Sequence, residues 1–117
     1  MSVKERIAFL DCAAFTADDL PIPNFDHNWS EYPDSDAADI VPRLFWSTTV
    51  ITHATPINAD AIGQLHKLIR IIVTGPAVVD TAACEAREIA VRHLPTSDTP
   101  GQTLIDLLEA LIAEARH

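Results

Sequence analysis

Short apolar runs alternate along this chain with segments that begin at helix-capping residues, and this alternation constrains the fold more than any other feature. Residues 48–52 (TTVIT) and 68–73 (LIRIIV) are rich in β-branched side chains, which favour strands. Asn58 and Asp80 each stand just before a helical segment, where a side-chain oxygen can cap the first backbone N–H groups. Strands that alternate with helices predict an α/β fold, in which a parallel sheet is covered on both faces and joined by right-handed crossovers.

The same pattern gives five strands and four helices. The expected strands are 7–10, 29–32, 48–52, 68–73 and 89–91, and the expected helices are 36–45, 59–66, 81–87 and 100–116. Ser35 is placed to cap the first of these helices. Pro42 lies late in it and removes a backbone donor, so a short or kinked helix is expected. Residues 16–28, which are rich in Asp, Pro and Asn, predict an irregular connection.

The last helix has the clearest amphipathic pattern. Thr99-Pro100-Gly101-Gln102 has the spacing of a capping box, with proline at the first helical position. Apolar side chains then recur at helical spacing, while acidic residues and alanines take the other face. The inward-facing set is Leu104, Leu107, Leu108, Leu111, Ile112 and Ala115. An apolar stripe of this size is expected to be buried away from water, so the helix either folds back over the sheet or pairs with another chain.

The charge balance narrows the choice of partners. The 117 residues include 8 Lys and Arg against 17 Asp and Glu, a formal net charge of −9. A surface this acidic repels phosphate backbones and anionic membranes, so we expect no nucleic acid and no membrane as partners. The longest apolar runs are too short to span a bilayer and the start shows no signal-peptide pattern, which predicts a cytoplasmic protein. Cys12 and Cys84 lack any metal-ligand spacing, so buried reduced thiols and no metal site are expected.

Five segments of the chain occur in an order that resembles a known family. They are residues 6–12 (RIAFLDC), 20–33 (LPIPNFDHNWSEYP), 50–58 (VITHATPIN), 64–73 (QLHKLIRIIV) and 80–91 (DTAACEAREIAV). In this order they resemble the opening third of the D-isomer-specific 2-hydroxyacid dehydrogenases, especially the glycerate dehydrogenase or hydroxypyruvate reductase branch. The resemblance implies a flavodoxin-like three-layer sandwich, with a five-stranded parallel sheet in the order 2-1-3-4-5. It also implies that residues 1–117 form a single domain, matching the N-terminal part of the family's substrate domain.

The family continues into a dinucleotide-binding domain, and this sequence has no counterpart of the glycine-rich turn found there. Gly63, Gly75 and Gly101 are far apart and form no G-x-G-x-x-G motif. In the family, an Arg and a Glu of that domain work with a His near the end of the chain, and no position here matches them. We therefore expect no NAD or other cofactor and no autonomous dehydrogenase activity.

The loop after the expected fourth strand corresponds to part of the family's substrate-facing edge. In the family this loop typically reads like ATGTDNVD and holds the substrate carboxylate with backbone N–H groups; here residues 73–80 read VTGPAVVD. The ligand contacts that the resemblance implies are Thr74, Gly75, Pro76, Ala77 and, in the neighbouring loop, Thr55. The loop is shorter than the family's, Pro76 removes a donor and Val78 replaces a polar side chain. We favour the alternative interpretation, an ordinary strand-to-helix turn.

Two histidines stand at the ends of expected strands, where ligands bind in open α/β sheets. His53 follows the third strand in a segment (THATP) that resembles the family's TNKVP, and His93 follows the fifth strand. A titrating pair could serve as acid, base or metal ligand. Asp11, at the end of the first strand, is an acid at the same edge. Their catalytic role stays open, because polar residues at strand ends are also common without a function.

These observations leave three hypotheses. The first is a stand-alone, truncated and non-catalytic pseudoenzyme, an accessory protein that binds a small-molecule ligand or a partner, with a homodimer or protein partner held by the terminal helix. The second is a cofactor-independent enzyme acting on a small polar metabolite through His53, His93 and Asp11. The third is one half of a split dehydrogenase. We favour the first, because the family's catalytic set has no match and the substrate loop is altered.

Overall fold

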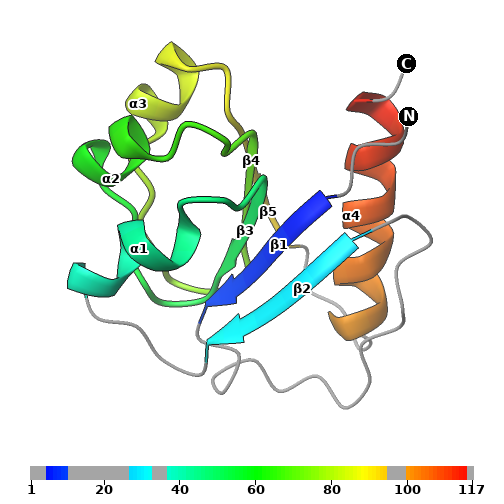
Figure 1. Cartoon of the computed structure of the whole chain (residues 1–117). Helices are drawn as coiled ribbons and strands as arrows, with labels where there is room; N and C mark the ends of the chain where they lie inside the picture. Colours follow the sequence, from blue (N-terminus) through cyan, green and yellow to red (C-terminus); the bar gives the residue numbers. More distant parts are fainter. Residues whose placement is uncertain (1–4, 11–26, 33–36, 95–99, 116–117) are drawn as a thin grey trace.

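The structure is a computed structural model that describes residues 5–10, 27–32, 37–94 and 100–115. Within these residues, five parallel strands form one sheet: β1 (Glu5–Leu10), β2 (His27–Tyr32), β3 (Thr49–Thr52), β4 (Arg70–Val73) and β5 (Ala90–His93). The α-helices are α1 (Ile40–Leu44), α2 (Ala59–Gln64), α3 (Thr81–Ala86) and α4 (Pro100–Ala115). Figure 1 shows α1, α2 and α3 on one face of the sheet and α4 on the other.

The strand order is β2-β1-β3-β4-β5, which confirms the predicted flavodoxin-like, three-layer α/β fold. Some boundaries differ from the expected ones. Helix α2 ends at Gln64 because Leu65 leaves the helical region, at φ −94° and ψ 78°. Strand β4 begins at Arg70 because Leu68 still belongs to a turn, in which its N–H donates to the Leu65 carbonyl at 3.2 Å. Strand β5 runs further than expected, to His93.

The first apolar layer lies between the sheet and helices α1 to α3. Alternate strand residues enter it, as expected of pleated strands: Ala8, Leu10, Val50, Ile71 and Val73. The helices contribute Ile40, Leu44, Ala61, Ile62 and Cys84. Cys84 is a buried free thiol, as predicted, whereas Cys12 lies outside the described residues.

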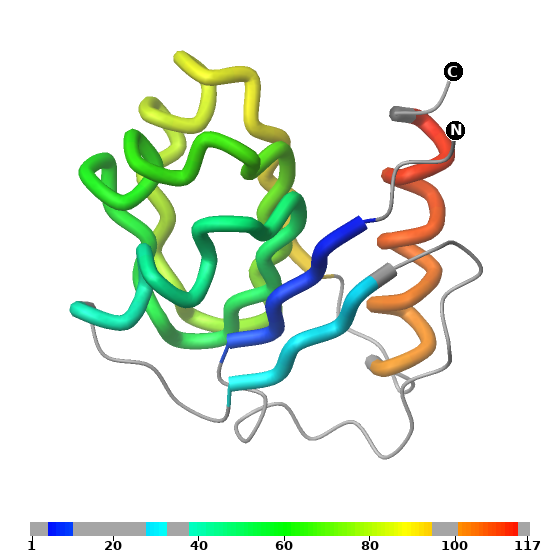
Figure 2. The backbone as a smooth tube through the Cα atoms, viewed as in Figure 1, coloured from blue at the N-terminus to red at the C-terminus, as the bar shows by residue number. Residues whose placement is uncertain are grey.

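Helix α4 covers the other face. Its buried side chains Leu104, Ile105, Leu108, Leu111 and Ile112 pack against Ile7, Phe9, Ile51 and Ile72 of the sheet. The trace in Figure 2 shows α4 beside β1, although the two are far apart in sequence. The helix therefore folds back over the sheet, one of the two expected outcomes, while pairing with another chain stays a prediction. The predicted stripe omits Ile105, which is 1% exposed, and includes Leu107, which is only half-buried.

Pro42 accounts for the short first helix. A 3₁₀ turn at Ala37–Asp39 leads into α1, which begins at Ile40. Pro42 thus falls in the first helical turn, where backbone N–H groups have no intrahelical acceptor and a missing donor costs little. The expected short helix is confirmed, but it begins later than residue 36. Ser35, its expected cap, lies outside the described residues.

Side-chain caps start the next two helices as predicted. Asn58 Oδ1 accepts from the Ala61 N–H at 2.9 Å, and Asp80 Oδ1 accepts from the Ala83 N–H at 3.0 Å. Each cap satisfies one of the backbone donors that a helix start leaves without a partner. These two residues therefore fix where the chain turns from each strand and loop into its helix.

Helix α3 ends in a Schellman motif. The Ile89 N–H donates to the Cys84 carbonyl at 2.8 Å, and the Glu88 N–H donates to the Glu85 carbonyl at 3.1 Å. The motif places Glu88 at φ 58°, in the left-handed region that side chains with a Cβ atom disfavour. Glycine is the usual residue at this position, so Glu88 carries a local strain.

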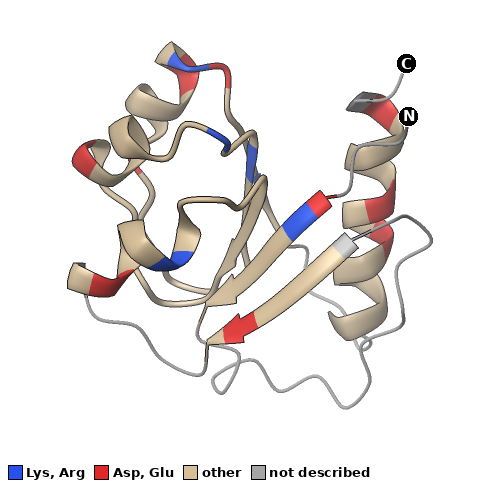
Figure 3. Ribbon diagram, in the orientation of Figure 1, with Lys and Arg blue, Asp and Glu red and all other residues tan. Residues whose placement is uncertain are grey.

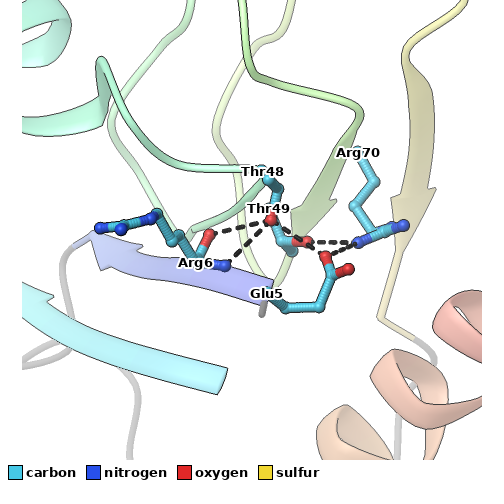
Figure 4. Close-up of polar contacts among 5 residues, drawn as sticks. All are labelled: Glu5, Arg6, Thr48, Thr49 and Arg70. Carbon is cyan, nitrogen blue, oxygen red and sulfur yellow. Dashed lines mark hydrogen bonds and ion pairs between the residues drawn. The ribbon is translucent and has the colours of Figure 1, made fainter. Parts of the chain in front are cut away.

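At the N-terminal edge of the sheet, a charged network is buried on the α4 side (Figure 4). Arg70 Nη1 lies 2.7 Å from Glu5 Oε1 and 2.8 Å from Thr49 Oγ1. Thr48 Oγ1 donates to the same Glu5 oxygen at 3.0 Å. The two charged side chains are nearly inaccessible to water, so each relies on the other and on the threonines to replace its hydration. The network ties the first residues of β1, β3 and β4 together.

Candidate functional site

The carboxyl ends of β3, β4 and β5 lie level with one another. The pairing register sets Thr52 opposite Val73, and Val73 opposite His93. The loops 53–58 and 74–80 leave this edge side by side and are hydrogen-bonded to each other. Ligands of open α/β sheets bind at this edge, and the predicted site residues among those described lie in or next to it.

His53, Thr74 and Gly75 meet at the centre of this edge. His53 Nδ1 lies 3.1 Å from Thr74 Oγ1. The imidazole ring covers Gly75 so closely that a Cβ atom at this position would lie 2.6 Å from the ring. Any larger residue at position 75 would therefore have to displace His53. The structure thus brings together three of the predicted residues, and the histidine occupies the space over the glycine.

The backbone donors of the loop after β4 are used inside the protein. The Thr74 N–H donates to the Thr52 carbonyl at 2.9 Å, and the Ala77 N–H donates to the His53 carbonyl at 2.9 Å. Pro76 has no N–H. A loop that binds an anion needs several N–H groups pointing at one spot. Positions 74, 76 and 77 offer no such donor to a ligand.

Further hydrogen bonds fasten the two loops to each other. The Ile57 N–H donates to the Val78 carbonyl at 3.0 Å, and the Asp80 N–H donates to the Ile57 carbonyl at 3.0 Å. Thr52, which is fully buried, donates its hydroxyl to the Thr55 carbonyl at 2.8 Å. The edge is therefore closed by its own loops.

A groove of about 280 Å³ between α1 and α2 reaches Thr55 in the loop after β3. Pro56, Asn58 and Asp60 line it together with residues of α1 and α2. The Asn58 side chain is already engaged as the cap of α2. Asp60 supplies a negative charge, which repels the carboxylate of a hydroxyacid. The groove therefore suits a neutral or cationic group better than an anion.

His93 lies apart from His53. It is exposed on the edge strand β5, and β4 separates that strand from β3. Two strand spacings put the backbones of these two strands roughly 10 Å apart, and the His53 ring lies against Thr74 and Gly75. Asp11 lies outside the described residues. Among the residues that the structure describes, no cluster of three or more His, Cys, Asp or Glu side chains is suited to hold a metal ion.

Two further properties of the described residues bear on function. Burial raises the pKa of the Cys84 thiol, and the nearby Asp80 carboxylate raises it further, while Arg87 opposes this. Cys84 therefore stays protonated near neutral pH and is a poor nucleophile.

None of the helices in the described ranges combines the length and the apolar character that crossing a bilayer requires.

The strand order and the two loops at the carboxyl edge define a flavodoxin-like α/β protein with a closed loop after β4. No family model matches the chain. A protein of Haemophilus influenzae described as "Putative 2-hydroxyacid dehydrogenase" is 34% identical over 111 residues, which are 91% of this chain and 35% of that protein. The glycerate dehydrogenase of Methylorubrum extorquens is 34% identical over 93 residues, 77% of this chain and 29% of that enzyme.

The chain belongs to the 2-hydroxyacid dehydrogenase family, and it spans about a third of the length of these two relatives. This confirms the resemblance found in the sequence.

Sequence reasoning missed the role of Thr52. The run TTVIT indicates a strand but assigns no partner to any of its hydroxyl groups. A usable signal was present: Thr52 lies two residues after Val50, so it shares the buried face of that strand. A polar side chain on a buried face requires a hydrogen-bond partner, and the carbonyl of Thr55 is within reach along the chain.

Proposed function

We propose that this chain is a non-catalytic member of the 2-hydroxyacid dehydrogenase family, an accessory protein that binds a partner or a small ligand and does not itself oxidise a hydroxyacid. One observation carries the proposal: two backbone donors of the loop after β4 are already hydrogen-bonded inside the protein. Thr74 and Ala77 donate their N–H groups to β3 and to the loop that follows it, and Pro76 has none to give. The His53 ring also fills the space over Gly75.

Opening this loop for a carboxylate has a clear physical cost. The Thr74 and Ala77 hydrogen bonds would have to break, and His53 would have to move away from Thr74. Each intramolecular hydrogen bond is worth about 1 kcal/mol net, so three of them oppose binding by roughly 3 kcal/mol. The formal charge of −9 adds a general repulsion of anions.

The test is a titration of the ¹⁵N-labelled chain with glycerate, the substrate in the name of one relative. We expect the amide signals of Gly75 and Ala77 to stay in place up to about 10 mM, well above a millimolar Kd. In a parallel assay with NAD and glycerate, we expect no formation of NADH.

Matched variants sharpen this test. Pro76→Gly restores a backbone donor and His53→Ala clears the space over Gly75, so the double variant should show larger glycerate-dependent shifts than the native chain. Val78→Ala changes a side chain of the same loop that is 73% exposed without adding a polar group, and it should leave the glycerate-dependent shifts unchanged. Saturable shifts at Gly75 and Ala77 in the native chain, or NADH formation that His53→Ala abolishes, would contradict the proposal.

A further inference from the structure

A second groove lies at the other end of the sheet, on the face that α1, α2 and α3 cover elsewhere. The register pairs Arg6 with Asn28 and Ala8 with Ser30, so Arg6, Asn28 and Ser30 point to that face. All three side chains are exposed, which means that no helix in the described part of the chain covers this corner. Apolar residues of β1 follow on the same face, where α1 begins to cover it.

The groove is bounded by the end of α1 and the segment that follows it. Pro42, Arg43, Trp46 and Ser47 form one wall, and the sheet residues form the floor, enclosing a volume of about 260 Å³. This volume is near the lower limit of small-molecule sites. The groove therefore fits a ligand of modest size.

Two of the eight basic residues of this acidic chain line the groove. The Arg6 side chain leaves β1 on the side opposite to Glu5 and takes no part in the buried ion pair (Figure 4). Arg43 is held in place by Asp39, at 3.8 Å, and by the ring of Tyr32, whose centroid lies 4.8 Å from the guanidinium carbon. Figure 3 shows basic residues at the start of β1 and in α1, whereas the described charges of α4 are all acidic. The groove thus presents two guanidinium groups on an acidic molecule, and one of them, that of Arg43, is also paired with Asp39.

Trp46 adds an aromatic surface to these charges. Its side chain is 62% exposed, an unusual state for so large an apolar group. Phe45 contacts it edge-on, with ring centroids 5.1 Å apart and planes at 83°, and Phe45 also contacts His66. The indole lies edge-on to Phe45 and beside the groove, where its exposed surface can stack on a flat ring.

We propose that this groove binds a small aromatic anion: a planar ring that stacks on Trp46, carrying a carboxylate or phosphate that pairs with Arg6 and Arg43. A guanidinium makes two parallel hydrogen bonds to either kind of anion. Asn28 and Ser30 offer further polar groups along the floor. A nucleic acid does not fit, since a chain of phosphates would meet the acidic remainder of the surface.

This inference names a ligand class for the proposed binding role, and it rests on that role. It uses no residue of the carboxyl edge. If no ligand binds in the groove, the glycerate titration at the carboxyl edge is not affected. If glycerate is oxidised at the carboxyl edge, ligand binding in the groove is not affected. The two proposals can therefore fail separately.

The experiment uses the fluorescence of Trp46. The chain has two tryptophans, so Trp29→Phe leaves Trp46 as the sole indole and keeps an aromatic contact with Phe9. This variant is titrated with benzoate, adenosine 5′-monophosphate and inorganic phosphate. We expect saturable quenching by benzoate or the nucleotide and a weaker response to phosphate alone. Quenching by benzoate assigns a carboxylate ligand and quenching by the nucleotide assigns a phosphate ligand.

Two arginine variants in the same background complete the test. Arg6→Gln should weaken binding of the quenching ligand roughly tenfold or more, because it removes a charged hydrogen-bond partner. Arg92→Gln, on the opposite edge strand β5, removes the same charge and should leave the affinity unchanged. Absence of saturable quenching, equal responses to phosphate and the aromatic anions, or equal losses in the two variants would overturn the proposal.

Discussion

The two edges of the sheet are built from different chemistry. At the N-terminal edge, Glu5 and Arg70 form a buried ion pair, supported by two threonines. At the carboxyl edge, the contacts that join the loops are made by uncharged groups: the Thr52 hydroxyl donates to the Thr55 carbonyl, and backbone N–H groups join the two loops to each other. Among the described residues, no buried side-chain nitrogen or oxygen lacks a hydrogen-bond partner at either edge. The buried ion pair therefore stabilises the packing of the strands, and we assign no ligand to it.

The ion pair also contributes to the register of the strands. It joins β1 to β4 across β3, the strand that lies between them. A slip of β4 by one residue would turn Arg70 to the other face and leave Glu5 with a buried, uncompensated charge. The carboxyl edge carries no comparable charge, so we expect its single substitutions to have smaller effects.

The largest effect is expected from breaking the N-terminal edge. Arg70→Met keeps most of the side-chain volume but leaves Glu5 buried without its counter-charge. We expect a loss of about 3–5 kcal/mol in the free energy of unfolding, measured by urea denaturation. A small domain has roughly 5–15 kcal/mol in total, so part of this variant should be unfolded at ambient temperature.

The matched control removes both charges. In Glu5→Met with Arg70→Met, apolar side chains replace the pair, and the stability should return to near the native value or exceed it. If the double variant is as unstable as Arg70→Met alone, the loss comes from packing and the description of this edge as an electrostatic tie is wrong.

At the carboxyl edge, the matching experiment is Thr52→Val. Valine has nearly the same shape, so the change removes only the hydrogen bond to the Thr55 carbonyl. We expect a loss of about 1 kcal/mol in the free energy of unfolding, clearly below that of Arg70→Met. A loss as large as the one at Arg70 would show that the two edges do not differ as proposed.

A smaller effect, of opposite sign, is expected beside the start of β5. Glu88→Gly relieves the positive φ of the Schellman motif, while glycine adds freedom to the unfolded chain. The balance should raise the free energy of unfolding by about 0.5 kcal/mol. Glu88→Ala keeps the strain and serves as the control. If the glycine and alanine variants have equal free energies of unfolding, the positive φ at residue 88 does not strain the native chain.

The smallest effect on stability at neutral pH is expected from the ionisation of Cys84, which lies in the apolar layer between the sheet and helices α1 to α3. Its pKa is raised in the folded state, so above about pH 9 the unfolded chain loses the thiol proton first. Stability from this group is therefore present below pH 9 and is lost as the pH rises. Urea midpoints from pH 8 to 10 should fall more steeply in the native chain than in Cys84→Ala. If the midpoints of the two proteins fall equally steeply with pH, ionisation of the Cys84 thiol is not the cause of the loss of stability.

The sequence predicts the parts of the fold that depend on neighbours in the chain. Asn58 and Asp80 cap their helices as expected, because a cap needs only the next three residues. The position of Ile105 could not be predicted in the same way. The face that α4 turns to the sheet depends on contacts with β1, β3 and β4, far away in sequence.

The candidate site shows the same division. The resemblance selects His53, Thr74 and Gly75, and the register of β3 and β4 brings them together. The closing hydrogen bonds could not be predicted, because they depend on where two loops meet. The Glu5–Arg70 pair was also missed, since nothing local distinguishes Arg70 from a solvated arginine in an apolar run. Trp46 offered no signal either, because exposure of a tryptophan is a property of the folded surface.

The place of α4 in the chain has a consequence for synthesis on the ribosome. Strand β1 is made early, yet the cover for Ile7 and Phe9 comes from residues 100–115. Until that helix leaves the exit tunnel, the nascent chain exposes these side chains together with Ile51 and Ile72. Nascent chains with such exposed apolar surface aggregate readily and are typical clients of chaperones. The strands should therefore reach their final packing only when translation has passed α4.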